Sequence, residues 1–196
     1  MLKIGITGGI GSGKSTVCRI FSQMGIPIYS ADNRAKQLMN ENQTLITAIK
    51  QLFGEEAYHE AKLNRAYISE RAFSNPALLE QLNALVHPAV AKDFLDWAIQ
   101  QKTPYVVKEA ALMYESGSFR DLDYVITVSA PKELRILRTM QRDGMSREQV
   151  LARMKRQWSE KQRNEAADFI IKNDGNHALI PQVLELHRKF LFISLG

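Results

Sequence analysis

The amino-acid sequence predicts an α/β fold in which helices cover both faces of a five-stranded parallel sheet. Two observations lead to this prediction. Short apolar runs typical of buried strands alternate with longer segments whose apolar residues recur at helical spacing. The first 30 residues also give a strand, a glycine-rich loop, a helix and a strand in that order, which is a βαβ unit. Parallel strands joined in this way need helices on both faces of the sheet.

Each strand and helix of this predicted fold has its own signal in the sequence. We expect strands at the five short apolar runs 3–7, 26–29, 105–107, 124–128 and 169–171. We expect helices at 13–24, 131–142, from Ser146 onward, and at about 177–190. Ser146 followed by Gln149 is a capping box, which marks the start of the third of these helices.

Residues 31–100 have a mostly helical pattern and no sign of a second sheet. Breaks between helices are expected at Gly54, Asn75-Pro76 and His87-Pro88, because glycine and proline interrupt helices. We therefore expect a helical insertion between the second and third strands.

Composition limits the class of protein. The 196 residues suit one globular domain with inserted parts, and 45% hydrophobic and 24% charged residues are ordinary for such a chain. Neither an apolar run of membrane-spanning length nor a secretion signal is present in the sequence. The single cysteine, Cys18, fits a reducing compartment. We expect a cytoplasmic protein with no membrane partner.

The net charge of +5 is concentrated in one segment. Between residues 131 and 163, ten Lys and Arg residues face four Asp and Glu residues, so this segment carries +6. Such a basic block indicates a phosphate-rich partner, a nucleotide or a nucleic acid, or else a solvated helix face.

The stretch Gly8-x-x-x-x-Gly13-Lys14-Ser15 matches the phosphate-binding loop pattern and lies between a strand and a helix. Its glycines let the backbone approach an anion closely, and the start of the helix favours negative charge. Lys14 would reach the β- and γ-phosphates, and the Ser15 hydroxyl would be a ligand of Mg²⁺. We therefore predict a nucleoside-triphosphate site formed by Gly8, Gly9, Gly11, Ser12, Gly13, Lys14, Ser15 and Thr16.

A kinase of small molecules also needs a base at its acceptor site and arginines that neutralise the phosphoryl group. Asp32 follows the carboxyl end of the second strand and is either this base or a helix N-cap. Arg138 and Arg142 are spaced to share one helix face, and Arg153 and Gln157 another. These basic helices form either a lid that excludes water from the triphosphate or ordinary exposed surface.

Seven motifs occur in order along the chain: TGGIGSGKST at 7–16, Ala31-Asp32, His87-Pro88-Ala89-Val90, Leu112-Met113-Tyr114-Glu115, Arg138-x-x-x-Arg142-Asp143-Gly144, Arg153-x-x-x-Gln157 and Asn173-Asp174-Gly175. Together they resemble the dephospho-coenzyme A kinase family over essentially the whole chain. The resemblance implies a three-layer P-loop kinase core, a helical acceptor-binding domain and a helical lid. The implied parts are the core at 1–30, 101–137 and 164–196, the acceptor domain at 31–100 and the lid at 138–163.

The resemblance also implies a reaction. ATP, with Mg²⁺, would phosphorylate the ribose 3′-hydroxyl of dephospho-coenzyme A in the last step of coenzyme A synthesis. Asp32 would be the base, and Lys14 and Arg142 the other catalytic residues. Arg138 and Arg153 are further candidates for phosphate contacts. By the same resemblance, Asn173 and Gly175 would lie near the adenine.

Some positions are ambiguous or depart from the family pattern. His87 belongs either to the acceptor region or simply beside a helix that starts at the proline. Glu109 stands where the family often has aspartate, and either serves Mg²⁺ through water or is structural. Further departures are at Ser30, Lys36 and Ala111.

Two other functions are compatible with the same motifs. One is a different small-molecule kinase, acting on a nucleoside or a monophosphate. The other is a nucleotide-gated nucleic-acid-binding protein, but only Trp158 supplies an aromatic ring within the basic block. We expect a small-molecule substrate, no nucleic acid, and a monomer or weak homo-oligomer.

Overall fold

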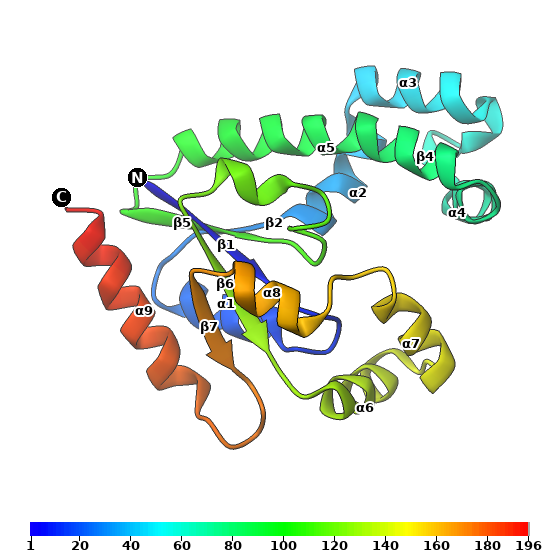
Figure 1. Cartoon of the computed structure of the whole chain (residues 1–196). Helices are drawn as coiled ribbons and strands as arrows, with labels where there is room; N and C mark the ends of the chain where they lie inside the picture. Colours follow the sequence, from blue (N-terminus) through cyan, green and yellow to red (C-terminus); the bar gives the residue numbers. More distant parts are fainter. Residues whose placement is uncertain (196) are drawn as a thin grey trace. The chain divides into compact units, whose positions relative to one another are not determined.

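The computed structural model describes residues 1–195, which form two compact units (Figure 1). The first unit contains residues 1–30 and the chain from residue 100 onward, and the second contains residues 31–99. Within residues 1–195, no helix has both the length and the apolar character needed to cross a membrane.

The first unit is built on a five-stranded parallel sheet, as the sequence predicts. Its strands are β1 (Leu2–Thr7), β2 (Ile28–Ser30), β5 (Tyr105–Glu109), β6 (Tyr124–Ser129) and β7 (Phe169–Lys172). Their order across the sheet is β2-β5-β1-β6-β7, so β1 is central. Ile4 of β1 pairs with Val107 on one side and with Tyr124 on the other. The carboxyl ends of all five strands therefore lie at one edge of the sheet.

Helices and turns follow these strands. They are α1 (Lys14–Gln23), η2 (Ser118–Asp121), α6 (Lys132–Asp143), α7 (Arg147–Met154), α8 (Glu160–Ala166) and α9 (Leu179–Ile193). The capping box predicted at Ser146 is present at the start of α7. A second box, at Ser159 and Gln162, starts α8, a helix that the sequence pattern does not predict. The prediction that Arg153 and Gln157 share a helix face is wrong, because α7 ends at Met154. Gln157 and Trp158 both lie in the connection between α7 and α8.

Alternating side chains of β6 show how helices cover both faces of the sheet. Ile126 and Val128 belong to a buried cluster that also contains Phe21 of α1 and Phe190 of α9. Thr127, between them, faces the opposite side. Its hydroxyl donates a 3.3 Å hydrogen bond to the carbonyl of Arg163 in α8. The unit thus has three layers, and Figure 1 shows α9 along the sheet beside β7.

The second unit is mainly helical. Its elements are α2 (Ala31–Glu41), α3 (Gln43–Phe53), η1 (Glu55–Ala57), β3 (Tyr58–His59), β4 (Lys62–Leu63), α4 (Arg65–Ser74) and α5 (Pro76–Ile99). The long helix α5 contacts α2, α3 and α4 and so forms the centre of this unit. The antiparallel pair β3–β4 is not indicated by the helical pattern of this segment.

The prediction of a helix break at His87-Pro88 is wrong, because α5 continues through both residues. Proline removes one helical hydrogen bond, which disfavours a helix interior. The packing of one side of α5 outweighs this cost, since buried residues recur every four positions on both sides of the proline. These residues are Leu82, Val86, Val90, Phe94 and Ala98. The expectation that His87 stands beside a helix start at the proline is wrong for the same reason.

Candidate active site

The glycine-rich loop connects the end of β1 to the start of α1. Gly11 and Gly13 have φ angles of 76° and 96°, which favour glycine. The Ser12 N–H donates to the carbonyl of Gly9 at 3.0 Å and closes a turn inside the loop. The Lys14 ammonium donates to the carbonyl of Gly8 at 2.9 Å and lies across the loop. This is the local geometry that a phosphate-binding loop requires.

Two of the loop glycines are also required by close packing. A Cβ on Gly13 would lie 2.1 Å from Nδ2 of Asn173, and a Cβ on Gly11 would lie 2.2 Å from the carbonyl oxygen of Arg135. The carbonyl of Arg135 is backbone and cannot move away, whereas the Asn173 amide would have to rotate and give up its contact with the loop. The loop is therefore held tightly by α6 and by the turn after β7.

Asn173 connects that turn to the loop. Its side-chain amide donates a 2.7 Å hydrogen bond to the carbonyl of Ser12. Arg138 of α6 in turn donates to the carbonyl of Asn173 at 3.0 Å. The structure thus brings Asn173 and Arg138 together with the loop. Gly175, with φ of 90°, lies in the same turn and is exposed.

Ser15 and Glu109 meet at the carboxyl ends of β1 and β5. The Ser15 hydroxyl donates to Oε1 of Glu109 at 3.0 Å. A hydroxyl and a carboxylate are oxygen ligands of the kind that Mg²⁺ prefers. Residues 1–195 contain no group of three or more His, Cys, Asp or Glu residues placed to hold a metal. The pair therefore suits Mg²⁺, which Ser15 would hold with Glu109 adjacent.

Two buried arginines lie behind the loop. Arg135 is 7% exposed and Arg163 is 2% exposed. A Cβ on Gly9 would lie 2.0 Å from Nη1 of Arg135 and 2.8 Å from Nη2 of Arg163. Glu160 compensates part of this charge, with 3.3 Å between its Oε2 and Nη2 of Arg135. Burial lowers the pKa of both guanidinium groups, and the charge of Arg135 lowers the pKa of Arg163 further. Two guanidinium groups, whose charge is only partly compensated, therefore lie behind the loop.

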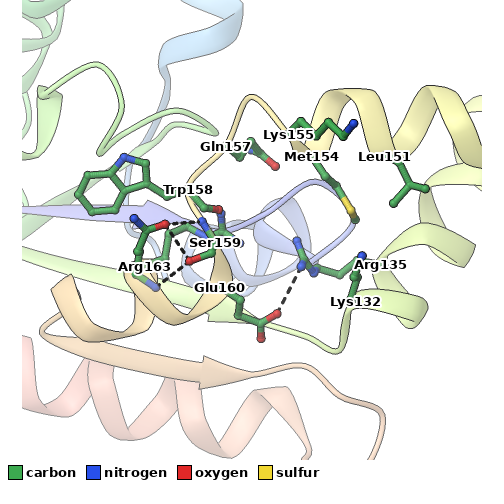
Figure 2. A pocket seen from close by; sticks show the side chains of 11 residues that line it. Lys132, Arg135, Leu151, Met154, Lys155, Gln157, Trp158, Ser159, Glu160 and Arg163 are labelled. Carbon is green, nitrogen blue, oxygen red and sulfur yellow. Dashed lines mark hydrogen bonds and ion pairs between the residues drawn. The ribbon is translucent and has the colours of Figure 1, made fainter.

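These arginines form part of the wall of a cavity of about 720 Å³ among α6, α7 and α8 (Figure 2). The lining is mixed, with cationic, amide and apolar side chains. It consists of Lys132, Arg135, Leu151, Met154, Lys155, Gln157, Trp158, Ser159, Glu160, Gln162 and Arg163.

The other predicted lid arginines are placed differently. Arg142 forms a bidentate pair with the adjacent Asp143, at 2.7 and 2.9 Å, and is 63% exposed in its side chain. This pair raises the pKa of Arg142 and lowers the pKa of Asp143. Arg153 is exposed on α7. In the described part of the chain, neither arginine donates a hydrogen bond to the loop, whereas Arg138 reaches it through Asn173.

Asp32 and His87 belong to the second unit. Asp32 is exposed, two residues after β2 ends. It lies inside the first turn of α2, which begins at Ala31, so the alternative that Asp32 is a helix N-cap is wrong. His87 lies in the middle of α5. Cys18, by contrast, lies in the core of the first unit at 4% exposure, and its burial raises the pKa of the thiol.

Several residues around the loop are not singled out by the sequence pattern. Arg135 and Arg163 stand out there only as two of ten cations in the basic block. Arg135 and Thr139 are four positions apart and therefore share one face of α6, where both are buried. This spacing is a weak sign in the sequence that a polar face of α6 packs against another part of the protein. Gln157 is part of a motif, but the pattern gives it no partner.

A parallel sheet, a phosphate loop between β1 and α1 and a basic helical hairpin together define the class of P-loop phosphotransferases. Comparison with known proteins agrees with this class. Shikimate kinase from Acinetobacter baumannii shares the fold, with a TM-score of 0.52 and 17% identity over 100% of this chain and 96% of that one. At that identity the likeness concerns the fold alone.

More similar proteins define the family. The family model described as dephospho-CoA kinase matches residues 2–178. Dephospho-CoA kinase of Porphyromonas gingivalis is 41% identical over 187 residues, which are 95% of this chain and 93% of the relative. The enzyme of the same name from Bacteroides fragilis is 38% identical over 186 residues, covering 94% and 91%.

Solved structures agree with these relatives. Dephospho-CoA kinase from Campylobacter jejuni has a TM-score of 0.70 and 31% identity over 99% of this chain and 98% of that one. The crystal structure of TT1252 from Thermus thermophilus has a TM-score of 0.83 and 35% identity over 100% and 98%. This chain belongs to the dephospho-CoA kinase family.

Proposed function

We propose that this protein transfers the γ-phosphoryl group of ATP to the ribose 3′-hydroxyl of dephospho-CoA, giving CoA and ADP. This is the last step of CoA synthesis. The observation that carries the proposal is the phosphate loop of residues 8–16, in a chain that matches the dephospho-CoA kinase family over residues 2–178. The acceptor oxygen forms a bond to the γ-phosphorus of ATP. The bond between this phosphorus and the oxygen that bridges it to the β-phosphate breaks, and ADP leaves.

The loop binds the triphosphate in this proposal. Its backbone N–H groups and the start of α1 meet the phosphate oxygens, and Lys14 neutralises charge on the β- and γ-phosphates. Ser15 holds Mg²⁺, with Glu109 adjacent to it at 3.0 Å. When bound, Mg²⁺ neutralises charge on the phosphate oxygens.

Asp32 is the base that accepts the proton of the acceptor hydroxyl in this proposal. Its support is its chemistry and its place in the chain, two residues past the carboxyl end of β2, where parallel sheets present ligand-binding residues. The helical unit of residues 31–99 takes the acceptor, and the lid at 138–163 covers the triphosphate.

The arginines and the turn after β7 have separate roles. Arg142 and Arg153 lie exposed in the lid and contact phosphate once ATP is bound. Arg138, Asn173 and Gly175 contribute from the adenine side, where Asn173 already contacts the loop.

Three finer points belong to the proposal. The reaction uses Mg²⁺, the protein works in the cytoplasm, and it is a monomer or a weak homo-oligomer. The single, buried Cys18 supports a reducing compartment.

A panel of acceptors tests the function. Formation of ADP from ATP and Mg²⁺ is measured with dephospho-CoA, adenosine, AMP and shikimate, and the product is identified by mass and by the position of its phosphate. We expect ADP to form with dephospho-CoA and the product to be CoA, and the Lys14→Ala variant to form neither. A faster reaction with another acceptor, or phosphate at another oxygen, would overturn the assignment.

A further inference from the structure

Gln157 lies in the connection between α7 and α8, outside both helices. Both the oxygen and the nitrogen of its side-chain amide form hydrogen bonds. The oxygen Oε1 accepts a 2.8 Å hydrogen bond from the N–H of Ile10, in the middle of the phosphate loop. The nitrogen Nε2 donates a 3.1 Å hydrogen bond to the carbonyl of Ala111, two residues beyond β5. One amide therefore ties the end of the lid to the loop and to the segment after β5.

The residue that follows fixes the position of this amide. The N–H of Trp158 donates a 2.6 Å hydrogen bond to Oε1 of Glu115. The ring of Trp158 stacks on Tyr114, with 5.0 Å between centroids and 9° between planes. The connection is thus anchored three times to residues 111–115. Figure 2 shows Gln157 and Trp158 together at one side of the cavity.

The bond to Ile10 fixes a peptide whose orientation matters for binding. Phosphate is held by backbone N–H groups that converge, and convergence depends on the rotation of each peptide plane. The Ile10 N–H is directed to Gln157, and the next residue, Gly11, has the positive φ of 76° that turns the chain. With Gly9 packed against two buried arginines, the Gly9–Ile10 peptide is fixed on both sides.

We propose that Gln157 is a positioning residue for the phosphates of ATP. It acts through the Ile10 peptide and does not touch the reacting atoms. It sets the loop in its binding conformation and couples it to the segment that follows β5. The inference rests on the proposed function in one respect, because ATP is taken as the ligand.

Two variants and one control test this role. Gln157→Met has a similar length and removes both hydrogen bonds, and Gln157→Asn keeps the amide but is too short to reach both partners. The control, Gln23→Met, makes the same change at the exposed last residue of α1, outside the loop and the lid. Dissociation constants of ATP and of inorganic tripolyphosphate are measured by calorimetry without acceptor. Melting temperatures and the KM values of both substrates are measured on the same samples.

We expect both Gln157 variants to bind ATP and tripolyphosphate about three- to tenfold more weakly, because the neutral hydrogen bond to the Ile10 N–H of the loop is lost. The KM for ATP rises with them, while the KM for dephospho-CoA and the affinities of the control stay unchanged. A residue with a merely structural role would lower the melting temperature and leave the phosphate affinities of the folded protein unchanged. If Gln157→Met does not fold, Gln157→Asn gives the measurement.

The inference is wrong if both ligands bind the folded Gln157→Asn protein as they bind the wild type. It is also wrong if the KM values of the two substrates rise equally. These outcomes differ from a failure of the proposed function, in which wild-type protein binds ATP but does not phosphorylate dephospho-CoA.

Discussion

The side-chain amide of Asn173 donates a 2.7 Å hydrogen bond to the backbone carbonyl of Ser12, although 161 positions separate the two residues. This contact closes the phosphate loop against the turn that follows the edge strand β7. Arg138 holds Asn173 from the other side through the Asn173 carbonyl. The loop conformation thus depends on residues at the far end of the chain as well as on its own glycines.

Asn173→Ala is therefore expected to weaken ATP binding. The Ser12 carbonyl loses its partner, at a cost of about 1 kcal/mol, or roughly fivefold in affinity, while the sheet stays folded. Titration with ATP measures the effect, and Asn176→Ala, in the same exposed turn, is the control. Equal affinities for Asn173→Ala and wild type would contradict a bracing role for this contact.

Gly13 and Gly25 offer a comparison between crowding and backbone strain. Both have a positive φ, 96° and 80°, but a Cβ on Gly13 meets Asn173 at 2.1 Å, whereas Gly25 has no neighbour within 4 Å. We expect Gly25→Ala to lose about 1 kcal/mol of unfolding free energy and to keep ATP binding. Gly13→Ala is expected to lose more stability and most ATP binding. Denaturant unfolding and ATP titration of both variants check this, and equal behaviour of the two would refute it.

Asp32→Asn separates the two interpretations of Asp32. The alternative to a base is a carboxylate that stabilises the first turn of α2 through the helix dipole. Loss of its charge would then cost about 0.5 kcal/mol of stability and leave turnover unchanged. A base predicts retained ATP binding and a kcat about 10²- to 10⁴-fold lower. Steady-state kinetics decide between them, with Asp96→Asn on α5, whose side chain pairs with Lys92 at the surface, as the control. Near-normal turnover of Asp32→Asn would leave Asp32 with only a helix-stabilising role.

The core of the first unit contains a pH-sensitive contact. Nδ1 of His187 lies 2.6 Å from the hydroxyl of Tyr105, and burial lowers the pKa of His187 below its ordinary value of 6.5. The unfolded chain then binds more protons than the folded one as pH falls through this value, so acid favours unfolding.

The free energy of unfolding should therefore fall between about pH 7 and pH 5. Unfolding in denaturant at several pH values measures this, and His187→Gln should flatten the dependence. His59→Gln, at an exposed position, should leave it as in the wild type. A dependence that persists fully in His187→Gln would show that another group causes it.

Local patterns predict most of the core. Short apolar runs predict the strands, and glycines followed by a lysine predict the phosphate loop. Both signals lie within a few neighbouring residues, so the sequence displays them directly. Pro88 shows the limit of such rules. Its effect on α5 depends on whether the helix face around it is buried, and Val86 and Val90 are buried on either side. Tertiary packing therefore outweighs a local preference that the sequence displays clearly.

The surroundings of the loop are harder to predict for a related reason. Arg163 lies next to Gly9 only because α8 covers the face of the sheet that Thr127 presents. In the sequence it is one charge among many in a basic block, and its burial follows from topology. The same holds for Gln157, whose two partners are far from it along the chain. Residues that support a site from distant segments carry no local signal.

The central claim is that the loop of residues 8–16 delivers the γ-phosphoryl group of ATP to the 3′-hydroxyl of dephospho-CoA. The most direct measurement follows a label placed in that γ-phosphoryl group through a single incubation of protein, ATP, Mg²⁺ and dephospho-CoA. The account predicts that the label appears in the 3′-phosphate of CoA, in an amount equal to the ADP formed, and that Lys14→Ala forms neither labelled CoA nor ADP. Label recovered as inorganic phosphate, or in any other position of the acceptor, would contradict it.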